Sequence, residues 1–72
     1  MTPDRLAHMA NHIAGYFAAY GHDQAIEGIA DHLQKFWEPR MRRALLAQVA
    51  SGGAGLDPLV VEAARRLERS RA

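Results

Sequence analysis

The sequence predicts a small all-α protein, a bundle of three to four short helices. Apolar residues recur every three or four positions along most of the chain, which is the spacing of one buried helix face. No stretch alternates apolar and polar residues with the period of two that is typical of strands. All three prolines stand where a helix can begin. The expected order is a helical hairpin, a proline corner, a third helix, a Gly-rich loop and a fourth helix.

The first helix is expected to begin at Pro3 with Thr2 as its N-cap, and Gly21 is the natural stop. One apolar stripe, with Tyr16 on its flank, is expected to face the core. Its members are Leu6, Met9, Ala10, Ile13, Phe17 and Tyr20.

The second helix is expected to follow at once, with Asp23 as its N-cap, and to end at Trp37 or Glu38 before Pro39. Gly28 costs about 1 kcal/mol relative to Ala inside a helix, so it is expected to mark a close helix crossing. The short connection predicts an antiparallel hairpin with the first helix. The buried stripe predicted for this helix is Ala25, Ile26, Ile29, Ala30, Leu33, Phe36 and Trp37.

The third helix is predicted from Pro39 to about Ser51, and the segment 52–56 is predicted to be a flexible, Gly-rich loop. Asp57 then caps a fourth helix that begins at Pro58. The apolar residues expected to face the core are Met41, Leu45, Leu46 and Val49 in the third helix, and Leu59, Val60, Ala63, Ala64 and Leu67 in the fourth.

The length and composition indicate a single small domain, residues 1–72, with a modest core. A core of this size rarely contributes more than about 3–5 kcal/mol, so chains like this often rely on disulfides, metals or association. The chain has no cysteine, which excludes disulfides and thiolate metal sites. Association with a partner is the remaining source of stability.

The charge balance argues against a protein whose main role is to coat nucleic acid. Nine Lys and Arg residues oppose eight Asp and Glu residues, for a formal charge of +1. All the basic residues except Lys35 are arginines, whose planar fork suits fixed contacts with carboxylates or phosphates. No apolar run approaches the ~18 residues of a membrane span, and the first residues lack the layout of a secretory signal. A cytoplasmic protein that makes a specific protein contact is expected.

The stretch 36–43 is the organising corner, since it holds the only tryptophan, a proline and three arginines. Arginines at the start of a helix face the positive end of its dipole, which costs about 0.3–1 kcal/mol per exposed charge. Glu38 and Arg42 have the spacing of a surface ion pair, but the other arginines lack a local carboxylate. These arginines, together with the free N–H groups of the helix start, favour the binding of an acidic loop or a phosphate group.

Adjacent side chains on a helix diverge, so one of the two aromatic rings at this corner can face the core while the other faces a partner. Which ring does which remains open. Trp and Arg are enriched among interface hot spots. The predicted partner-binding residues are Phe36, Trp37, Pro39, Arg40, Met41, Arg42 and Arg43.

Candidate catalytic and metal-binding residues are few. His8 and His12 have the four-residue spacing that can place two imidazoles on one metal, but no third ligand is evident. His32 and Asp31 are adjacent, and adjacent helical residues do not face each other. There is no Ser/His/Asp arrangement and no phosphate-binding loop after a strand. Catalysis by this chain alone is not expected, and no metal site or cofactor-binding residue is assigned.

Several runs, in order and over nearly the whole chain, carry a family resemblance. They are Met9-Ala10-Asn11, Asp31-His32-Leu33, Phe36-Trp37-Glu38-Pro39-Arg40-Met41-Arg42, Gly52-Gly53 and Leu56-Asp57-Pro58-Leu59-Val60. With them the chain resembles the delta subunit of the NAD-dependent, molybdenum-containing formate dehydrogenases of bacteria. The run from Phe36 to Arg42 is the most specific, and His12 departs from the Gln expected in this family.

The resemblance implies a non-catalytic, accessory subunit of a cytoplasmic complex that interconverts formate and carbon dioxide. The large subunit of such complexes carries molybdenum bis-guanine-dinucleotide and iron–sulfur clusters, and the beta and gamma subunits carry FMN and further clusters and reduce NAD. None of the residues that bind these cofactors can be carried over to this chain. Docking on the large subunit, to support its assembly or cofactor-loaded state, is the expected role.

Two alternatives are a transient factor in cofactor insertion and a helical module for nucleic-acid binding or general protein interaction. The balanced charge counts against nucleic acid, as does the absence of a recognisable helix-turn-helix spacing. A free-standing metal enzyme is a third possibility.

Overall fold

The computed structural model describes residues 2–70, with side chains described for residues 2–69, and this part of the chain is helical without strands. The predicted all-α class is therefore confirmed. Met1 and residues 71–72 of the predicted domain lie outside the described residues. The elements are α1 (Pro3–Phe17), a short 3₁₀-helix η1 (Ala18–Tyr20), α2 (His22–Phe36), α3 (Pro39–Ala50) and α4 (Pro58–Ser70).

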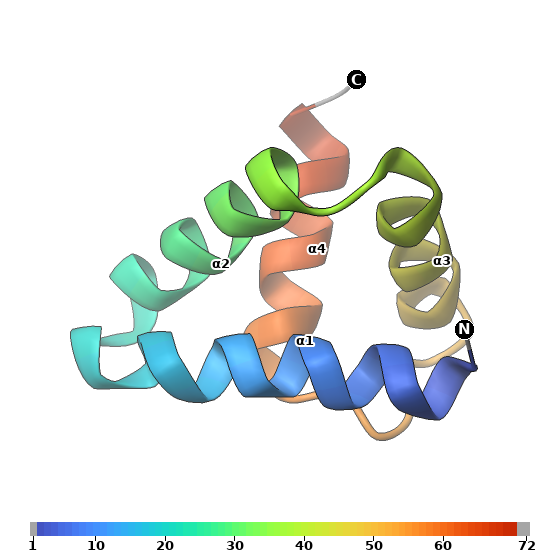
Figure 1. Ribbon diagram of the computed structural model, residues 1–72. Coiled ribbons are helices and arrows are strands. Elements are labelled where there is room, and N and C mark those ends of the chain that lie inside the picture. Colours follow the sequence, from blue (N-terminus) through green and yellow to red (C-terminus); the bar gives the residue numbers. More distant parts are fainter. Residues whose placement is uncertain (1, 71–72) are drawn as a thin grey trace.

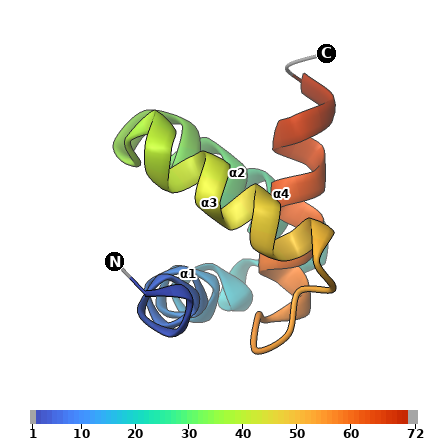
Figure 2. The same cartoon turned by 90° about the vertical axis from the view of Figure 1, so that its right-hand side faces the viewer.

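The helices cross at wide angles rather than lying parallel. In Figure 1, α1 runs along the bottom of the view, α2 and α3 stand above it on either side, and α4 passes behind. The view turned by 90° shows α3 lying above α1, with α4 upright beside both (Figure 2). The predicted hairpin of α1 and α2 is therefore an open one, since the two helices diverge from their shared corner.

The first helix begins as predicted and ends differently. The Oγ1 of Thr2 accepts a hydrogen bond from the Arg5 N–H at 3.2 Å, which confirms the N-cap. The chain then tightens into η1, so Tyr20 lies beyond the end of α1. Tyr20, predicted to be buried, is 54% exposed.

The turn into α2 depends on Gly21, whose φ of 92° is a conformation that side chains rarely adopt. The helix begins at His22, so the prediction of Asp23 as N-cap is wrong: Asp23 lies in the first turn. The predicted close crossing at Gly28 is confirmed. A Cβ placed there would lie 2.6 Å from ring carbons of Phe17, so the α1 ring occupies the space a side chain would need.

The core lies where α2 packs on α4, and α1 and α3 cover it. Its largest fully buried side chains are Ile29, Leu33, Leu45 and Val60. Full burial of such a side chain contributes about 1.5–3 kcal/mol relative to exposure. Alanines let the helices approach closely around this centre, and Ala10, Ala14, Ala25, Ala63 and Ala64 are all buried.

The predicted loop between α3 and α4 is held by one side chain of α1. The Nδ2 of Asn11 donates to the Gly55 carbonyl at 2.8 Å, and its Oδ1 accepts from the Asp57 N–H at 2.8 Å. Asp57 then caps α4 as predicted, because its Oδ1 accepts from the Leu59 N–H at 2.9 Å. A loop expected to be flexible is thus clamped to α1.

Candidate docking surface

Arg42 closes the corner between α2 and α3 from the inside. Its Nη1 donates to the carbonyl oxygens of Leu33 at 3.4 Å and Gln34 at 3.2 Å, and to that of Trp37. The last carbonyls of a helix lack intrahelical partners and form the negative end of its dipole, although that of Leu33 also accepts from the Trp37 N–H at 3.2 Å. The end of α2 therefore compensates the unfavourable position of this arginine at the start of α3. Among the described residues no ion pair joins Arg42 to Glu38, so that predicted pairing is not formed.

The corner divides its two aromatic residues between the inside and the outside. Trp37 is only 6% exposed and belongs to the core cluster, whereas Phe36 is 73% exposed. The prediction that Phe36 faces the core is wrong, because α2 ends at this residue and its ring lies against His32, with ring centroids 4.9 Å apart. The outward ring of the corner is Phe36.

The outer side of the corner is positively charged. Pro39, Arg40 and Arg43 are exposed, and Met41 is partly buried against the core. Within the described residues, neither the Arg40 side chain nor the Arg43 side chain forms a hydrogen bond or ion pair. The first turn of α3 has no acidic residue, and its N-cap, Glu38, makes no side-chain capping hydrogen bond, so the exposed Glu38 carboxylate offsets the positive end of this helix by its charge alone.

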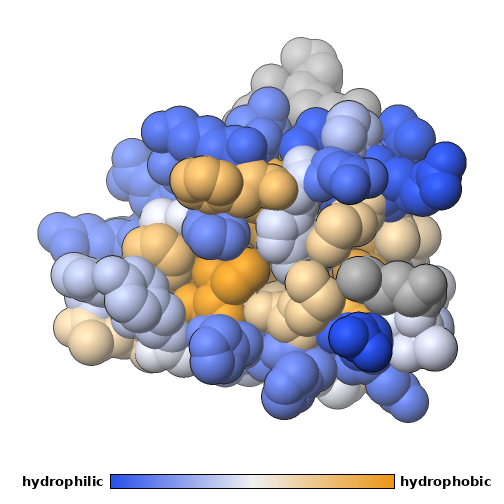
Figure 3. Space-filling view, in the orientation of Figure 1, coloured by the Kyte–Doolittle hydropathy of each residue, from blue (hydrophilic) through white to orange (hydrophobic). Residues whose placement is uncertain are grey.

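A groove of about 620 Å³ runs along α3 beside the first turn of α1. Arg40 is its only charged lining residue among those described. Figure 3 shows the face seen in Figure 1, with hydrophobic surface in its middle and hydrophilic residues above and below. The groove's lining is mostly apolar and comprises Thr2, Pro3, Leu6, Arg40, Met41, Ala44, Ala47, Gln48 and Ser51.

Comparison with known proteins gives one match. A family model described as the NADH-dependent formate dehydrogenase delta subunit FdsD covers residues 5–64 of the 72. The chain belongs to the FdsD family. The matched segment of this FdsD chain includes both the corner closed by Arg42 and the loop clamped by Asn11, and it confirms the resemblance found in the sequence. No curated protein and no solved structure matches the chain.

The side chains of this FdsD chain do not fit the metal centres of a formate dehydrogenase. The chain has no cysteine to ligate an iron–sulfur cluster. His8 and His12 are exposed on α1, and within residues 2–69 no three His, Asp or Glu side chains gather as metal ligands. His32 lies against Phe36, while Asp31 pairs with Lys35 at 3.2 Å.

None of the described helices is long and apolar enough to cross a bilayer.

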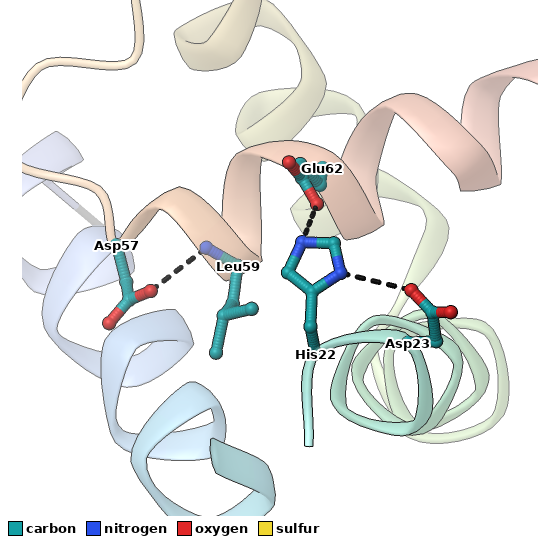
Figure 4. Close-up of polar contacts among 5 residues, drawn as sticks. All are labelled: His22, Asp23, Asp57, Leu59 and Glu62. Atoms are coloured by element: carbon teal, nitrogen blue, oxygen red, sulfur yellow. Dashed lines mark hydrogen bonds and ion pairs between the residues drawn. The ribbon is translucent and has the colours of Figure 1, made fainter.

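One polar contact was not predicted from the sequence. The His22 ring at the start of α2 lies between two carboxylates, with Nδ1 3.0 Å from Asp23 Oδ1 and Nε2 2.7 Å from Glu62 Oε2 of α4 (Figure 4). The hydrogen bond to Asp23 and the negative charge of Glu62 raise the pKa of His22 above its ordinary value. The pairing with α4 is long-range, so no local pattern could have indicated it.

A second exposed apolar patch of this FdsD chain lies where α1 ends. Tyr16 and Tyr20 are 68% and 54% exposed, and both rings contact Phe17. A side-chain hydrogen bond with Tyr16 raises the pKa of the Tyr20 hydroxyl. The sequence placed Tyr16 on the flank of the buried stripe, and its exposure agrees with that position.

Proposed function

We propose that this chain is the accessory delta subunit of a cytoplasmic, NAD-dependent molybdenum formate dehydrogenase, and that it docks on the large molybdenum-binding subunit. The observation that carries the proposal is the FdsD family match over residues 5–64. The name of that family places it in an enzyme with other subunits. The choice of the large subunit as partner rests on the resemblance described above.

The docking corner of this proposal is the outward side of the α2–α3 connection, made of Phe36, Pro39, Arg40, Met41 and Arg43. A large exposed phenylalanine ring beside arginines without internal partners has the residue types that are enriched in protein interfaces. Trp37 and Arg42 serve the same site from within, since their contacts fix the backbone that carries the exposed residues.

The cofactors of the proposed complex belong to the other subunits. Molybdenum bis-guanine-dinucleotide and iron–sulfur clusters would reside in the large subunit, with FMN and further clusters in the beta and gamma subunits and NAD as their substrate. The absence of cysteine from this chain agrees with that division. The role left for the delta subunit is non-catalytic support of the assembled, cofactor-loaded state.

Binding alone can supply such support by mass action. A partner that binds only the folded, loaded subunit stabilises it by about 2.7 kcal/mol when the partner's free concentration is 100 times its Kd. The same binding stabilises the delta subunit, whose own core is small.

The test is copurification of the tagged chain with the coexpressed large subunit. The variant Phe36→Ala/Arg40→Ala removes exposed side chains only, so we expect it to remain helical but to retain about tenfold less large subunit. The matched control Tyr16→Ala/Arg65→Ala also removes one exposed aromatic ring and one exposed arginine, away from the corner, and should behave like wild type. Undiminished copurification of the corner variant would reject the docking corner, and no copurification of wild type would reject the docking itself.

Subunit stoichiometry decides between a permanent subunit and a transient insertion factor. Our proposal requires the chain at one copy per large subunit in the purified, active enzyme. Fully active enzyme that lacks the chain would instead favour the transient role.

A further inference from the structure

The groove between α1 and α3 supplies chemistry that the proposed docking corner does not. Met41, Ala44 and Ala47 give it an apolar lining that the described residues leave uncovered, and the buried Leu6 lies at its floor. Two of them, Ala44 and Ala47, are exposed alanines within a helix whose other face is buried. The groove is thus a place where a second apolar surface can approach the α3 backbone closely.

The groove has the length and shape of a helix-binding site. Its α3 residues run from Arg40 to Ser51, which is about 16 Å at 1.5 Å per residue, or three helical turns. Alanines along one helix face leave a shallow channel into which the side-chain ridge of another helix can pack. A segment that binds as an added strand would need a free strand edge, and the described residues contain no strand; a polyproline segment would need an aromatic-lined groove, and no aromatic residue is among the described residues that line this one.

The charge of the groove selects the kind of helix. Arg40 stands at its α3 N-terminal end, and no acidic side chain is among the described residues that line it. Arg40 has no hydrogen bond or ion pair within the described part of the chain. The first N–H groups of α3 receive no side-chain cap, and the acidic N-cap residue Glu38 does not line the groove, so the helix start can still accept a partner's carboxylate there. A carboxylate on the partner would complement both.

We propose that this groove binds one amphipathic helix of the partner subunit, with its apolar face on Met41, Ala44 and Ala47 and an Asp or Glu opposite Arg40. This inference rests on the proposed function, since it specifies which kind of segment the large subunit presents. It excludes a basic helix, because such a helix would bring like charge to Arg40 in a partly desolvated site.

The experiment uses the complex formed by the full chain coexpressed with the large subunit. The variant Ala47→Glu places a carboxylate where the partner's apolar face is expected. The variant Arg40→Glu places one opposite the partner's expected Asp or Glu. We expect each to lower copurification about tenfold. The matched control is Ala50→Glu, on the same helix at an exposed alanine that does not line the groove. It should copurify like wild type, and circular dichroism of all three establishes that they fold.

A photo-crosslinking amino acid in place of Ala44 identifies the occupant. The inference requires a crosslink to a helical segment of the large subunit that carries an Asp or Glu, and replacing that acid by Arg should restore binding to Arg40→Glu. Crosslinks to a second copy of this chain, to a basic segment or to an irregular loop would overturn it. If wild type and Ala47→Glu copurify equally well with the large subunit, the groove assignment fails but the proposed function does not. If wild type does not copurify, the proposed function fails as well.

Discussion

The two connections on either side of α3 are each closed by a single polar side chain, and they differ in what that side chain must provide. At the corner, Arg42 donates to three carbonyl oxygens and accepts nothing. At the loop, Asn11 donates to one backbone carbonyl and accepts from one backbone N–H. The corner therefore needs a cation of sufficient reach, whereas the loop needs an amide.

The same two connections also differ in what they leave outside. The loop segment 52–56 is rich in glycine, and Ala54 is its only exposed residue other than glycine, so the clamp by Asn11 serves the fold. The corner exposes Phe36, Arg40 and Arg43, so the contact made by Arg42 serves both the fold and the proposed interface. A connection that is closed from within can present its other side chains to a partner.

The largest expected effect separates the inner and outer aromatic residues of the corner. Trp37→Ala should lower the free energy of unfolding by about 3–5 kcal/mol, because it leaves a cavity in the core. Phe36→Ala should change it by no more than about 0.5 kcal/mol, since that ring is mostly exposed. Urea denaturation followed by circular dichroism measures both. Equal losses for the two variants would contradict the division between core and interface.

A smaller effect on stability is expected at the loop, where the Asn11 amide acts both as a hydrogen-bond donor and as an acceptor. Asn11→Ala removes two hydrogen bonds and should lower the free energy of unfolding by about 2 kcal/mol. Asn11→Asp should be no better, because a carboxylate would face the Gly55 carbonyl without a proton to donate. Denaturation midpoints of the two variants test this. If Asn11→Asp were as stable as wild type, the clamp would require only an acceptor.

The corner should tolerate a conservative substitution of its closing side chain, whereas the loop should not. Arg42→Ala is expected to lower the free energy of unfolding by about 1–2 kcal/mol, because charged donors contribute more than neutral ones. Arg42→Lys keeps the positive charge at the end of α2 and should recover at least half of that loss. Arg43→Ala, the exposed neighbour, is the control and should be neutral. A loss in Arg42→Lys as large as in Arg42→Ala would show that charge is not the main contribution.

The smallest effect is a pH dependence that links α2 to α4. Asp23 and Glu62 raise the folded-state pKa of His22 above its ordinary value. Its contribution to stability is therefore fully present below the unfolded pKa and is lost as pH rises through the higher folded pKa. His22→Gln should flatten this decline as pH rises from about 6.5, the ordinary pKa of histidine, while His8→Gln should leave it intact. Thermal melts across that range measure the slope, and an unchanged slope in His22→Gln would refute the assignment.

Helix starts could be predicted because their signals are local. Thr2-Pro3, Pro39 and Asp57-Pro58 each combine a fixed proline φ with a cap or a helix boundary, and all were placed correctly. The start of α2 was misplaced because Gly21 turns the chain through positive φ, which makes a separate Asp cap unnecessary.

Burial was predicted well in helix interiors and poorly at helix ends. The stripe of α2 matches the buried residues except at Phe36, where the helix stops, and that of α4 matches except at Leu59, which is only partly buried. Tyr20 lies beyond the end of α1, in η1, and is exposed. Hydrophobic periodicity indicates in which direction a side chain points around the helix axis. It does not indicate whether another element packs against that side chain.

The site was predicted only in part, because its decisive contacts are long-range. The sequence located the corner at residues 36–43, but it could not tell which ring faces out or that Arg42 binds the end of α2. The contacts of Asn11 with the loop and of His22 with Glu62 join residues far apart in the chain. Nothing in a local pattern specifies such pairs.

The contact of Arg42 with the end of α2 has a consequence for the thermodynamics of assembly. Because the backbone turn is already fixed by hydrogen bonds within the free chain, little main-chain entropy remains to be lost there when a partner binds. Only the side chains of Phe36, Arg40 and Arg43 must be immobilised, at about 0.5–1.5 kcal/mol each. A subunit with a small core of its own can in this way present a rigid surface, and most of its interaction free energy remains available for affinity.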